Sequence, residues 1–177
     1  MLKIQPPNYK FCPFCGKELR TKLEENKKRK FCPFCKWTYY PHVGTAVAAV
    51  IIKDNKVLMV KRKREPFRGT WMFPAGFVDY GEHPEDALVR EVKEETGLKT
   101  KEAELLKIIQ IEDDPRSLGH FCFFYKVIAE GEGLTTNKEE NEGIDWFDLD
   151  KPPKIGWKSH KEIWSLFGRH YTLKIGK

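Results

Sequence analysis

The segment GFVDYGEHPEDALVREVKEETGL occupies residues 76–98 and contains the most informative pattern of the chain. Glu91, Glu94 and Glu95 are spaced i, i+3 and i+4, so a helix would place their carboxylates on one face. Like charges this close repel one another unless a cation lies between them. Carboxylate oxygens are ligands that Mg²⁺ and Mn²⁺ prefer, and the spacing therefore predicts a divalent-metal site that acts on phosphates.

The residues around the glutamates predict a loop followed by a helix. Pro84 suits the first helical turn, and Gly97 suits the end of the helix because glycine accepts a left-handed conformation. His83 stands where Ser, Thr or Asp usually caps a helix, so we expect a weak cap. Leu88 and Val92 predict an apolar stripe that faces away from the carboxylates.

This segment resembles the Nudix box, whose pattern is Gly-x5-Glu-x7-Arg-Glu-apolar-x-Glu-Glu-x-Gly-apolar. Every position is matched, by Gly76, Glu82, Arg90, Glu91, Val92, Glu94, Glu95, Gly97 and Leu98. A solvated amphipathic helix would explain the charges but not the fixed offsets. The resemblance implies the Nudix fold, an α+β fold with a mixed β-sheet between helices.

The resemblance also implies a role for each residue of the box. Glu91, Glu94 and Glu95 would bind Mg²⁺ or Mn²⁺, helped by the carbonyl oxygen of Gly76. Glu82 would support this site from the loop.

Further candidates lie beside these residues and beyond the box. Arg90 can pair with the acidic face of the helix and hold it in place. The general base varies within the family, and it is either a glutamate of the box or one outside it. The outside candidates are Glu139, Glu140 and Glu142.

Candidate substrate contacts lie upstream of the helix. Arg62 and Arg64 could bind phosphates, although an exposed strand end would explain them equally well. Phe77 and Tyr80 could stack on a base, although aromatic residues at strand spacing more often belong to a core.

The resemblance implies hydrolysis of the pyrophosphate bond in nucleoside diphosphates linked to another group. NADH pyrophosphatases of the family carry a Ser-Gln-Pro-Trp-Pro-Phe-Pro-x-Ser array after the box, and residues 99–130 lack it. We therefore expect ADP-ribose or FAD as substrate. NADH and nucleoside triphosphates remain alternatives, as does a non-catalytic module that senses a nucleotide or binds RNA.

The first 41 residues predict a separate zinc ribbon. Cys12, Cys15, Cys32 and Cys35 form two Cys-x-x-Cys pairs that can surround Zn²⁺ tetrahedrally. A segment this short cannot bury enough surface to fold unaided, and a bound zinc would supply the missing stability. A closed four-sulfur site leaves no position for water, so we expect a structural role.

Positive charge is concentrated in the same segment. Residues 1–41 carry a net charge of +7, whereas residues 42–177 carry −1. Residues 27–30, Lys-Lys-Arg-Lys, are expected on a loop between the cysteine pairs. This charge could attract nucleic acid, but a solubilising surface is the favoured interpretation.

The remainder, residues 42–177, is expected to form the Nudix hydrolase domain. Apolar and alternating runs predict strands, and spaced apolar residues predict a helix at the C-terminus. The strands are expected at 45–53, 56–63, 105–112, 119–129 and 144–149. No apolar run suits a membrane span or a signal peptide, so we expect a cytosolic enzyme. Whether the chain forms a homodimer is left open.

Overall fold

The computed structural model describes residues 6–131, 134–135 and 137–172. The chain divides into two compact units, residues 1–43 and 44–177, close to the predicted boundary after residue 41. Within the described ranges, no helix combines the length and the apolar character needed to cross a membrane.

The first unit is built on an antiparallel hairpin. Strands β1 (Arg20–Glu24) and β2 (Lys27–Phe31) pair along their whole lengths. Glu25 and Asn26 form the turn with φ values of 49° and 61°. The prediction of a basic loop at 27–30 was wrong, because the chain reverses at this turn and residues 27–30 pair with β1 as part of strand β2.

The second unit contains a mixed β-sheet, as predicted, and the sheet has seven strands, two more than the ranges expected from the sequence. Strand β3 lies at its centre, parallel to β8 and antiparallel to β4 and β6. The other pairs, β4–β5, β4–β9 and β7–β8, are antiparallel. The strands are β3 (Thr45–Lys53), β4 (Lys56–Arg62), β5 (Trp71–Met72), β6 (Ala75–Phe77), β7 (Lys99–Gln110), β8 (Phe121–Glu130) and β9 (Asn141–Asp148).

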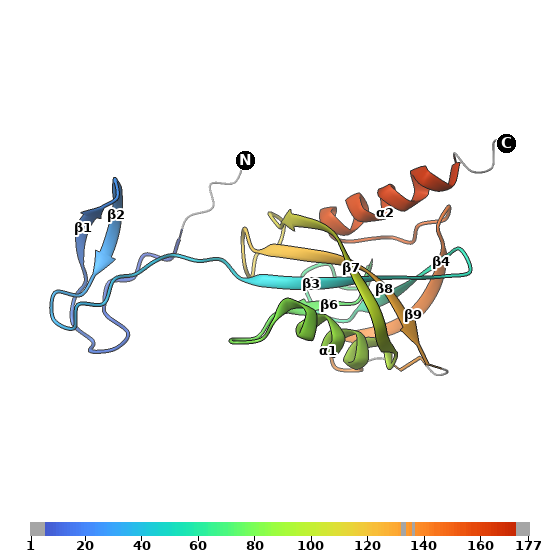
Figure 1. Ribbon diagram of the computed structural model, residues 1–177, viewed down its shortest axis with the longest axis horizontal. Coiled ribbons are helices and arrows are strands. Elements are labelled where there is room, and N and C mark those ends of the chain that lie inside the picture. The colour runs from blue at the N-terminus through green and yellow to red at the C-terminus, as the bar shows by residue number, and fades with distance from the viewer. Residues whose placement is uncertain (1–5, 132–133, 136, 173–177) are drawn as a thin grey trace. The chain divides into compact units, whose positions relative to one another are not determined.

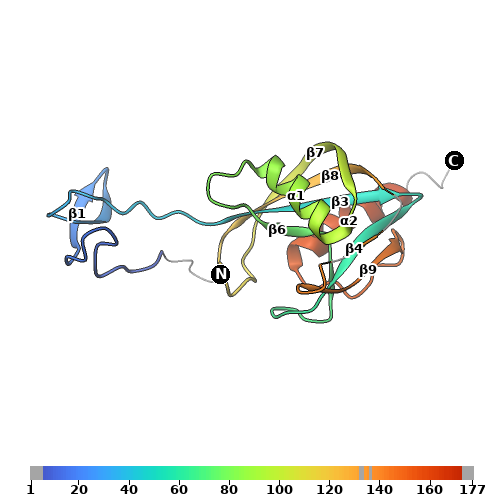
Figure 2. The same cartoon turned by 90° about the horizontal axis from the view of Figure 1, so that it is seen from below.

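Two helices cover opposite faces of this sheet (Figure 1; Figure 2 gives the orthogonal view). Helix α1 (Pro84–Thr96) packs Leu88 and Val92 in one core cluster, which includes Val47 of β3. Helix α2 (Lys158–Thr172) contributes Ile163 to the other cluster, which includes Ala48 of β3. Strand β3 is thus buried on both faces, which explains its uninterrupted apolar sequence.

The bounds of strand β7 were not predicted correctly from the alternation of apolar and polar residues. It begins at Lys99, well before the expected start at Leu105. Its pairing with β8 shifts register between Thr100 and Glu102 and again between Leu105 and Lys107. Each irregularity breaks the alternation of side chains, so the polar first half of the strand carries no clean two-residue period.

The ends of α1 follow from local chemistry. His83 caps the helix through Nδ1, which accepts a hydrogen bond of 3.3 Å from the Glu85 amide. This length is consistent with the expected weak cap. Gly97 ends the helix in the left-handed conformation, with φ 75°, as predicted.

Candidate active site and metal centre

Glu91 projects from α1 onto the backbone of β6. A Cβ atom built at Gly76 would lie only 2.0 Å from Glu91 Oε1, so the carboxylate occupies the space that any other residue would fill. Glycine is therefore required at this position of β6 by the close approach of the Glu91 carboxylate. Burial raises the pKa of Glu91 above its ordinary value.

Glu95 is the most deeply buried carboxylate of the site, with 2% of its surface exposed. Its Oε2 accepts a hydrogen bond of 2.7 Å from the Ala75 amide, and its Oε1 accepts one of 2.7 Å from Asn141 Nδ2. Despite these bonds, burial raises the pKa of Glu95 to about 8. A carboxylate in this position is costly to ionise without a nearby cation.

Arg90 holds the loop of the box against the helix. Its guanidinium binds Glu82 with two hydrogen bonds of 2.9 Å and Glu91 with one of 2.6 Å. It also donates to the carbonyl oxygen of Phe77 at 3.0 Å. The bonds from Arg90 lower the pKa of Glu82 to about 2, so Glu82 serves as an ionised anchor.

Glu91 and Glu95 line a cavity of about 320 Å³, and Glu94 does not. The Glu94 side chain is 52% exposed and lies 3.8 Å from Arg90 Nη1. Tyr80 is fully exposed and also lies outside this cavity. The predicted residues Gly76, Phe77, Arg62 and Arg64 all line it.

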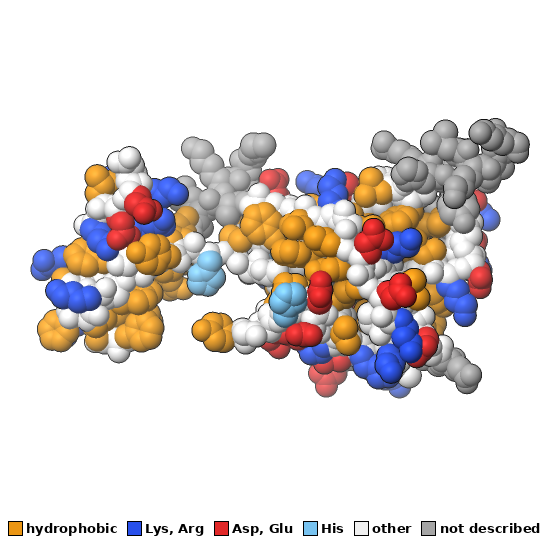
Figure 3. Space-filling view, viewed as in Figure 1, with side chains coloured by type: hydrophobic (Ala, Val, Ile, Leu, Met, Phe, Trp, Pro, Cys, Tyr) orange, Lys and Arg blue, Asp and Glu red, His pale blue; other side chains and the backbone are white. Residues whose placement is uncertain are grey.

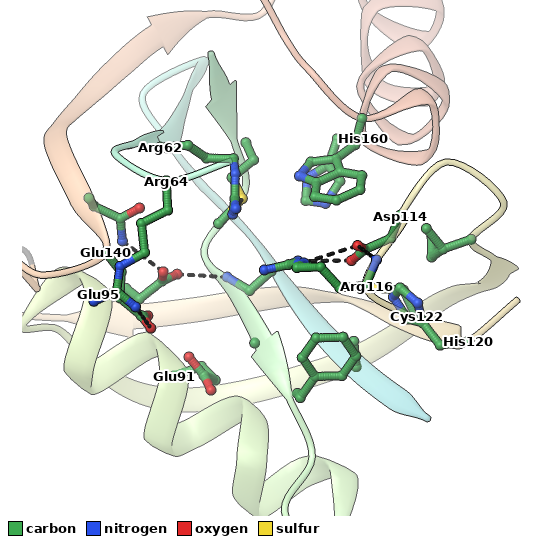
Figure 4. Close-up of a pocket in the computed structure, with 18 of the residues that line it drawn as sticks. Arg62, Arg64, Glu91, Glu95, Asp114, Arg116, His120, Cys122, Glu140 and His160 are labelled. Atoms are coloured by element: carbon green, nitrogen blue, oxygen red, sulfur yellow. Dashed lines mark hydrogen bonds and ion pairs between the residues drawn. The ribbon is translucent and has the colours of Figure 1, made fainter. Parts of the chain in front are cut away.

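The cavity has an acidic side, formed by Glu91, Glu95 and Glu140, and a basic side, formed by Arg62 and by Arg116 with its partner Asp114 (Figure 4). Glu91 and Glu95 face it from α1, whereas Arg62 and Arg116 enter from β4 and from the loop after β7. Arg64 lies nearer Glu140, with 3.6 Å between Arg64 Nη1 and Glu140 Oε1. Carboxylates opposite guanidinium groups suit a ligand that combines a metal cation with phosphates.

The donors on the acidic side fit a divalent cation. They are carboxylate oxygens, together with the Oδ1 atom of Asn141, which is buried without a hydrogen-bond partner. Hard oxygen donors of this kind suit Mg²⁺ or Mn²⁺. The oxygens of Glu91, Glu94 and Glu95 do not, however, all lie within the 4.8 Å that the cysteine sulfurs described below satisfy.

The outside glutamates separate by position. Glu140 lines the cavity, whereas Glu139 and Glu142 do not, and Glu142 forms an ion pair with Lys61 at 2.8 Å. Glu140 is thus the one of these three that faces the acidic side of the cavity.

Several residues that line the cavity were missed from the sequence: Asp114, Arg116, His120, Asn141, Trp157 and His160. They come from the loop after β7, from the start of β9 and from the region of α2. None of them has a fixed spacing to the box. Residues 113–117 lie between the expected strands 105–112 and 119–129, and their turn-rich composition gave no sign of a charged pair that faces inward.

His160 is a neutral, buried member of this wall. Its Nδ1 accepts a hydrogen bond of 3.1 Å from the Phe73 amide, and its ring stacks on Phe73 with 5.3 Å between the ring centroids. Burial lowers the pKa of His160 to about 3. The imidazole therefore serves as a hydrogen-bond acceptor and not as a cation.

We expect acidification to destabilise the second unit through His160. The unfolded chain binds a proton near the ordinary pKa of 6.5, whereas the folded chain resists protonation until about pH 3. The cost is absent above pH 6.5 and grows as the pH falls. It amounts to about 2 kcal/mol at pH 5, at about 1.36 kcal/mol per pH unit.

Urea unfolding followed by near-ultraviolet circular dichroism between pH 8 and pH 5 measures this loss as the difference between the wild-type chain and His160→Asn. The variant keeps an acceptor for the Phe73 amide but does not titrate, and both proteins share the opposite contribution of Glu95, whose raised pKa of about 8 stabilises the fold as the pH falls. The unfolding free energy of the wild-type chain should therefore fall relative to that of the variant by about 2 kcal/mol as the pH falls to 5. An equal pH dependence in both proteins would contradict the assignment.

The four cysteines of the first unit converge on one point. The Sγ atoms of Cys12 and Cys35 are 3.5 Å apart, as are those of Cys15 and Cys32, and all four lie within 4.8 Å of one another. A tetrahedral zinc with bonds of about 2.3 Å would separate its sulfurs by about 3.8 Å. The cluster therefore fits the predicted zinc ribbon.

Two equivalent turns build this cluster. The Gly16 amide donates to the Cys12 carbonyl at 2.9 Å, and the Lys36 amide donates to the Cys32 carbonyl at 3.0 Å. Gly16 and Lys36 have φ values of 68° and 64°. Because the two turns have the same geometry, the two sulfurs of each turn point toward the two sulfurs of the other turn.

Comparison with known proteins places the second unit. The sequence profile described as the NUDIX domain matches residues 42–167. The chain is 40% identical over 129 residues to the ADP-ribose pyrophosphatase of Methanocaldococcus jannaschii, which covers 72% of this chain and 75% of that protein.

Two further similarities extend over more of the chain. It is 30% identical over 148 residues to the NAD-capped RNA hydrolase NudC of Klebsiella pneumoniae, covering 84% of this chain and 55% of that protein. The chain thus spans only about half the length of this second relative. The crystal structure of a NUDIX hydrolase from Nitrosomonas europaea superposes with a TM-score of 0.74 at 24% identity, over 92% of this chain and 93% of that one.

Proposed function

Because this chain belongs to the Nudix family of hydrolases, we propose that it cleaves the pyrophosphate bond of nucleoside diphosphates linked to another group. The observation that carries the proposal is the cavity in which Glu91 and Glu95 face the guanidinium groups of Arg62 and Arg116. Our proposed substrates are ADP-ribose and FAD.

We assign the metal site to Glu91, Glu94, Glu95 and the Gly76 carbonyl, with Mg²⁺ or Mn²⁺ as the cation. When bound, such a cation neutralises the charge that develops on phosphate oxygens. Arg90 is a positioning residue, because its bonds to Glu82 and Glu91 fix the loop and one ligand together.

The remaining steps belong to side chains around the cavity. Arg62 and Arg64 would bind phosphate oxygens of the substrate. Glu140 would accept a proton from the attacking water, because it lines the cavity and Glu139 and Glu142 do not. Water adds to one phosphorus, the bridging P–O bond breaks, and ADP-ribose would give AMP and ribose 5-phosphate.

Two observations support ADP-ribose or FAD over NADH. The relative with 40% identity is an ADP-ribose pyrophosphatase, and residues 99–130 lack the array that marks NADH pyrophosphatases. In place of that array, the loop after β7 carries Asp114 and Arg116, and the Arg116 guanidinium donates two hydrogen bonds of 3.0 and 2.8 Å to the Asp114 carboxylate.

A second candidate function is removal of a nucleotide cap from RNA, the activity named for the NudC relative. The surface of the first unit favours it, because exposed aromatic rings lie beside basic side chains there (Figure 3). Lys17 lies 5.6 Å from the Phe34 ring centroid, and Arg29 lies 5.3 Å from that of Tyr40. Rings among cations are typical of surfaces that bind single-stranded nucleic acid.

A substrate panel with Mg²⁺ tests both functions. We expect ADP-ribose or FAD to be cleaved with a higher kcat/KM than NADH, and we expect excess EDTA to abolish cleavage. The quantity kcat/KM is the one to compare, because it measures transition-state binding between competing substrates. NADH cleaved at least tenfold better than both would contradict the preference, and NAD-capped RNA cleaved tenfold better than ADP-ribose would establish the second function.

We also propose a structural zinc in the first unit and a cytosolic location. The zinc proposal is supported by the sulfur geometry, and its test is given in the Discussion. The cytosolic location is supported by the sequence alone.

A further inference from the structure

Arg116 is fixed in one orientation by a buried carboxylate. Asp114 is only 1% exposed, and it accepts hydrogen bonds from Arg116 Nε at 3.0 Å, Nη2 at 2.8 Å and the backbone amide at 2.9 Å. Burial acts to raise the pKa of Asp114, but the bonds from Arg116 outweigh it and hold that pKa below its ordinary value. The pair is therefore ionised and rigid.

Two aromatic rings lie beside the same guanidinium. The Arg116 Cζ atom lies 5.9 Å from the Phe77 ring centroid and 5.8 Å from that of Trp157. Phe77 thus faces a cation here, and this contact gives it a role other than stacking on a base. Arg116 Nη1 has no hydrogen-bond partner among the residues that the structure describes, and so remains available to a ligand.

Arg62 shares the Trp157 ring, with 5.5 Å from its Cζ atom to the centroid. It is 8% exposed and donates to the Pro66 carbonyl at 2.8 Å and to Met72 Sδ at 3.5 Å. Within the described part of the chain it forms no ion pair with a carboxylate, and burial followed by the charge of Arg116 lowers its pKa. A buried cation beside a second cation is stabilised when an anion joins them.

The charges at this end of the cavity define the anion. Arg62, Arg116 and the Asp114 carboxylate together carry one net positive charge, and the other carboxylates that act on Arg62 are Glu95 and Glu140 of the acidic side. A phosphate esterified or linked on both sides carries one negative charge, whereas a terminal phosphate carries up to two near neutral pH, because its second pKa is about 6. The basic end therefore matches a bridging phosphate better than a terminal one.

We propose that Arg62 and the Asp114–Arg116 pair form a subsite for the phosphate of the substrate that lies away from the box glutamates, and that this subsite selects diphosphates substituted at both ends over nucleoside triphosphates. This inference rests on the proposed function, since it concerns the same cavity. Asp114 acts as a positioning residue, and Arg116 is the residue that contacts the phosphate.

The test compares ADP-ribose with ATP as substrates of the wild-type chain, of three variants of the subsite and of one control variant. Arg116→Gln should lower kcat/KM for ADP-ribose roughly 10- to 100-fold, mostly through KM, because one charged hydrogen-bonding group is lost. Arg116→Lys should lose roughly 10-fold, because an ammonium lacks the planar fork. Asp114→Asn should lower the preference for ADP-ribose over ATP by about 10-fold, since the subsite gains net positive charge. Arg20→Gln, in the first unit, is the matched control.

Calorimetric titration with ADP-ribose in EDTA supplies a readout that needs no turnover. Arg116→Gln should weaken the Kd at least tenfold there, whereas Arg20→Gln should leave it unchanged. If the wild-type chain cleaves no diphosphate with Mg²⁺, the proposed function fails. If it cleaves ADP-ribose and Arg116→Gln matches it in both kcat/KM and Kd, this inference alone fails. If Asp114→Asn does not fold, the two Arg116 variants still decide the outcome.

Discussion

Glu95→Gln should lower kcat for ADP-ribose roughly 10²–10³-fold while the protein stays folded. The substitution removes a negative charge from the proposed metal site, and losing several kcal/mol of charge stabilisation corresponds to such a factor. The geometry explains why folding should survive. A glutamine oxygen can still accept from the Ala75 amide, and its NH₂ group can donate to Asn141 Oδ1, which lacks a partner, once the Asn141 amide turns over.

Glu94→Gln should also lose most of the wild-type turnover, although Glu94, unlike Glu95, is not buried. Its side chain is half exposed, with Arg90 Nη1 at 3.8 Å as its ion-pair partner, so the substitution should not change the free energy of unfolding measurably. Glu104→Gln, on exposed strand β7, is the matched control and should keep full activity. Wild-type kcat in either Glu94→Gln or Glu95→Gln, at saturating Mg²⁺, would refute the assignment of that residue.

Cys32→Ser should abolish zinc binding and unfold the first unit. Among the described residues of this unit, from position 6 onward, the buried ones are Cys12, Leu19 and Cys32, with Cys15 and Trp37 packed against them. The sulfurs are thus most of its core, and a structural zinc contributes roughly 10–16 kcal/mol in comparable peptides. The second unit has two core clusters of its own and should remain folded.

Elemental analysis and a ¹H–¹⁵N correlation spectrum measure the two halves of this expectation. The wild-type chain, purified without added metal, should contain one zinc, and Cys32→Ser should contain almost none and lose the dispersed signals of residues 6–43. Cys122→Ala is the control, because Cys122 is buried in the second unit and should not affect the zinc content. A wild-type protein without zinc, or one with disulfides in reduced lysate, would overturn the zinc assignment.

The parts of the site that could be predicted are those with short-range spacing. The placement of Glu91 and Glu95 on one face of a helix follows from the helical period of 3.6 residues per turn. The end of that helix follows from the conformational freedom of Gly97. The cysteine cluster could equally be predicted, because a tight turn fixes the positions of the two cysteines in each pair. Strand β3 was found with its bounds because its apolar run is continuous.

Helical spacing nevertheless gave an incomplete account of the carboxylates. It placed three glutamates on one face, but the sheet covers only part of that face. Glu95 is enclosed by β6 and the start of β9, whereas Glu94 remains half exposed. Burial of one and exposure of the other depend on neighbours that are distant in the sequence, and no local pattern reports them.

The sequence by itself determined the helix that carries the box glutamates, the cysteine cluster and the class of chemistry, because each depends on residues a few positions apart whose geometry the backbone fixes locally. Only the tertiary structure decided which side chains face the helix across the cavity. Asp114 and Arg116 arrive from the loop after β7, Asn141 from β9, and His160 from α2. Their meeting depends on the parallel pairing of β3 with β8 and the antiparallel pairing of β4 with β9. Such long-range pairings are stabilised by the burial of a whole sheet, and that burial is a property of the complete core rather than of any segment.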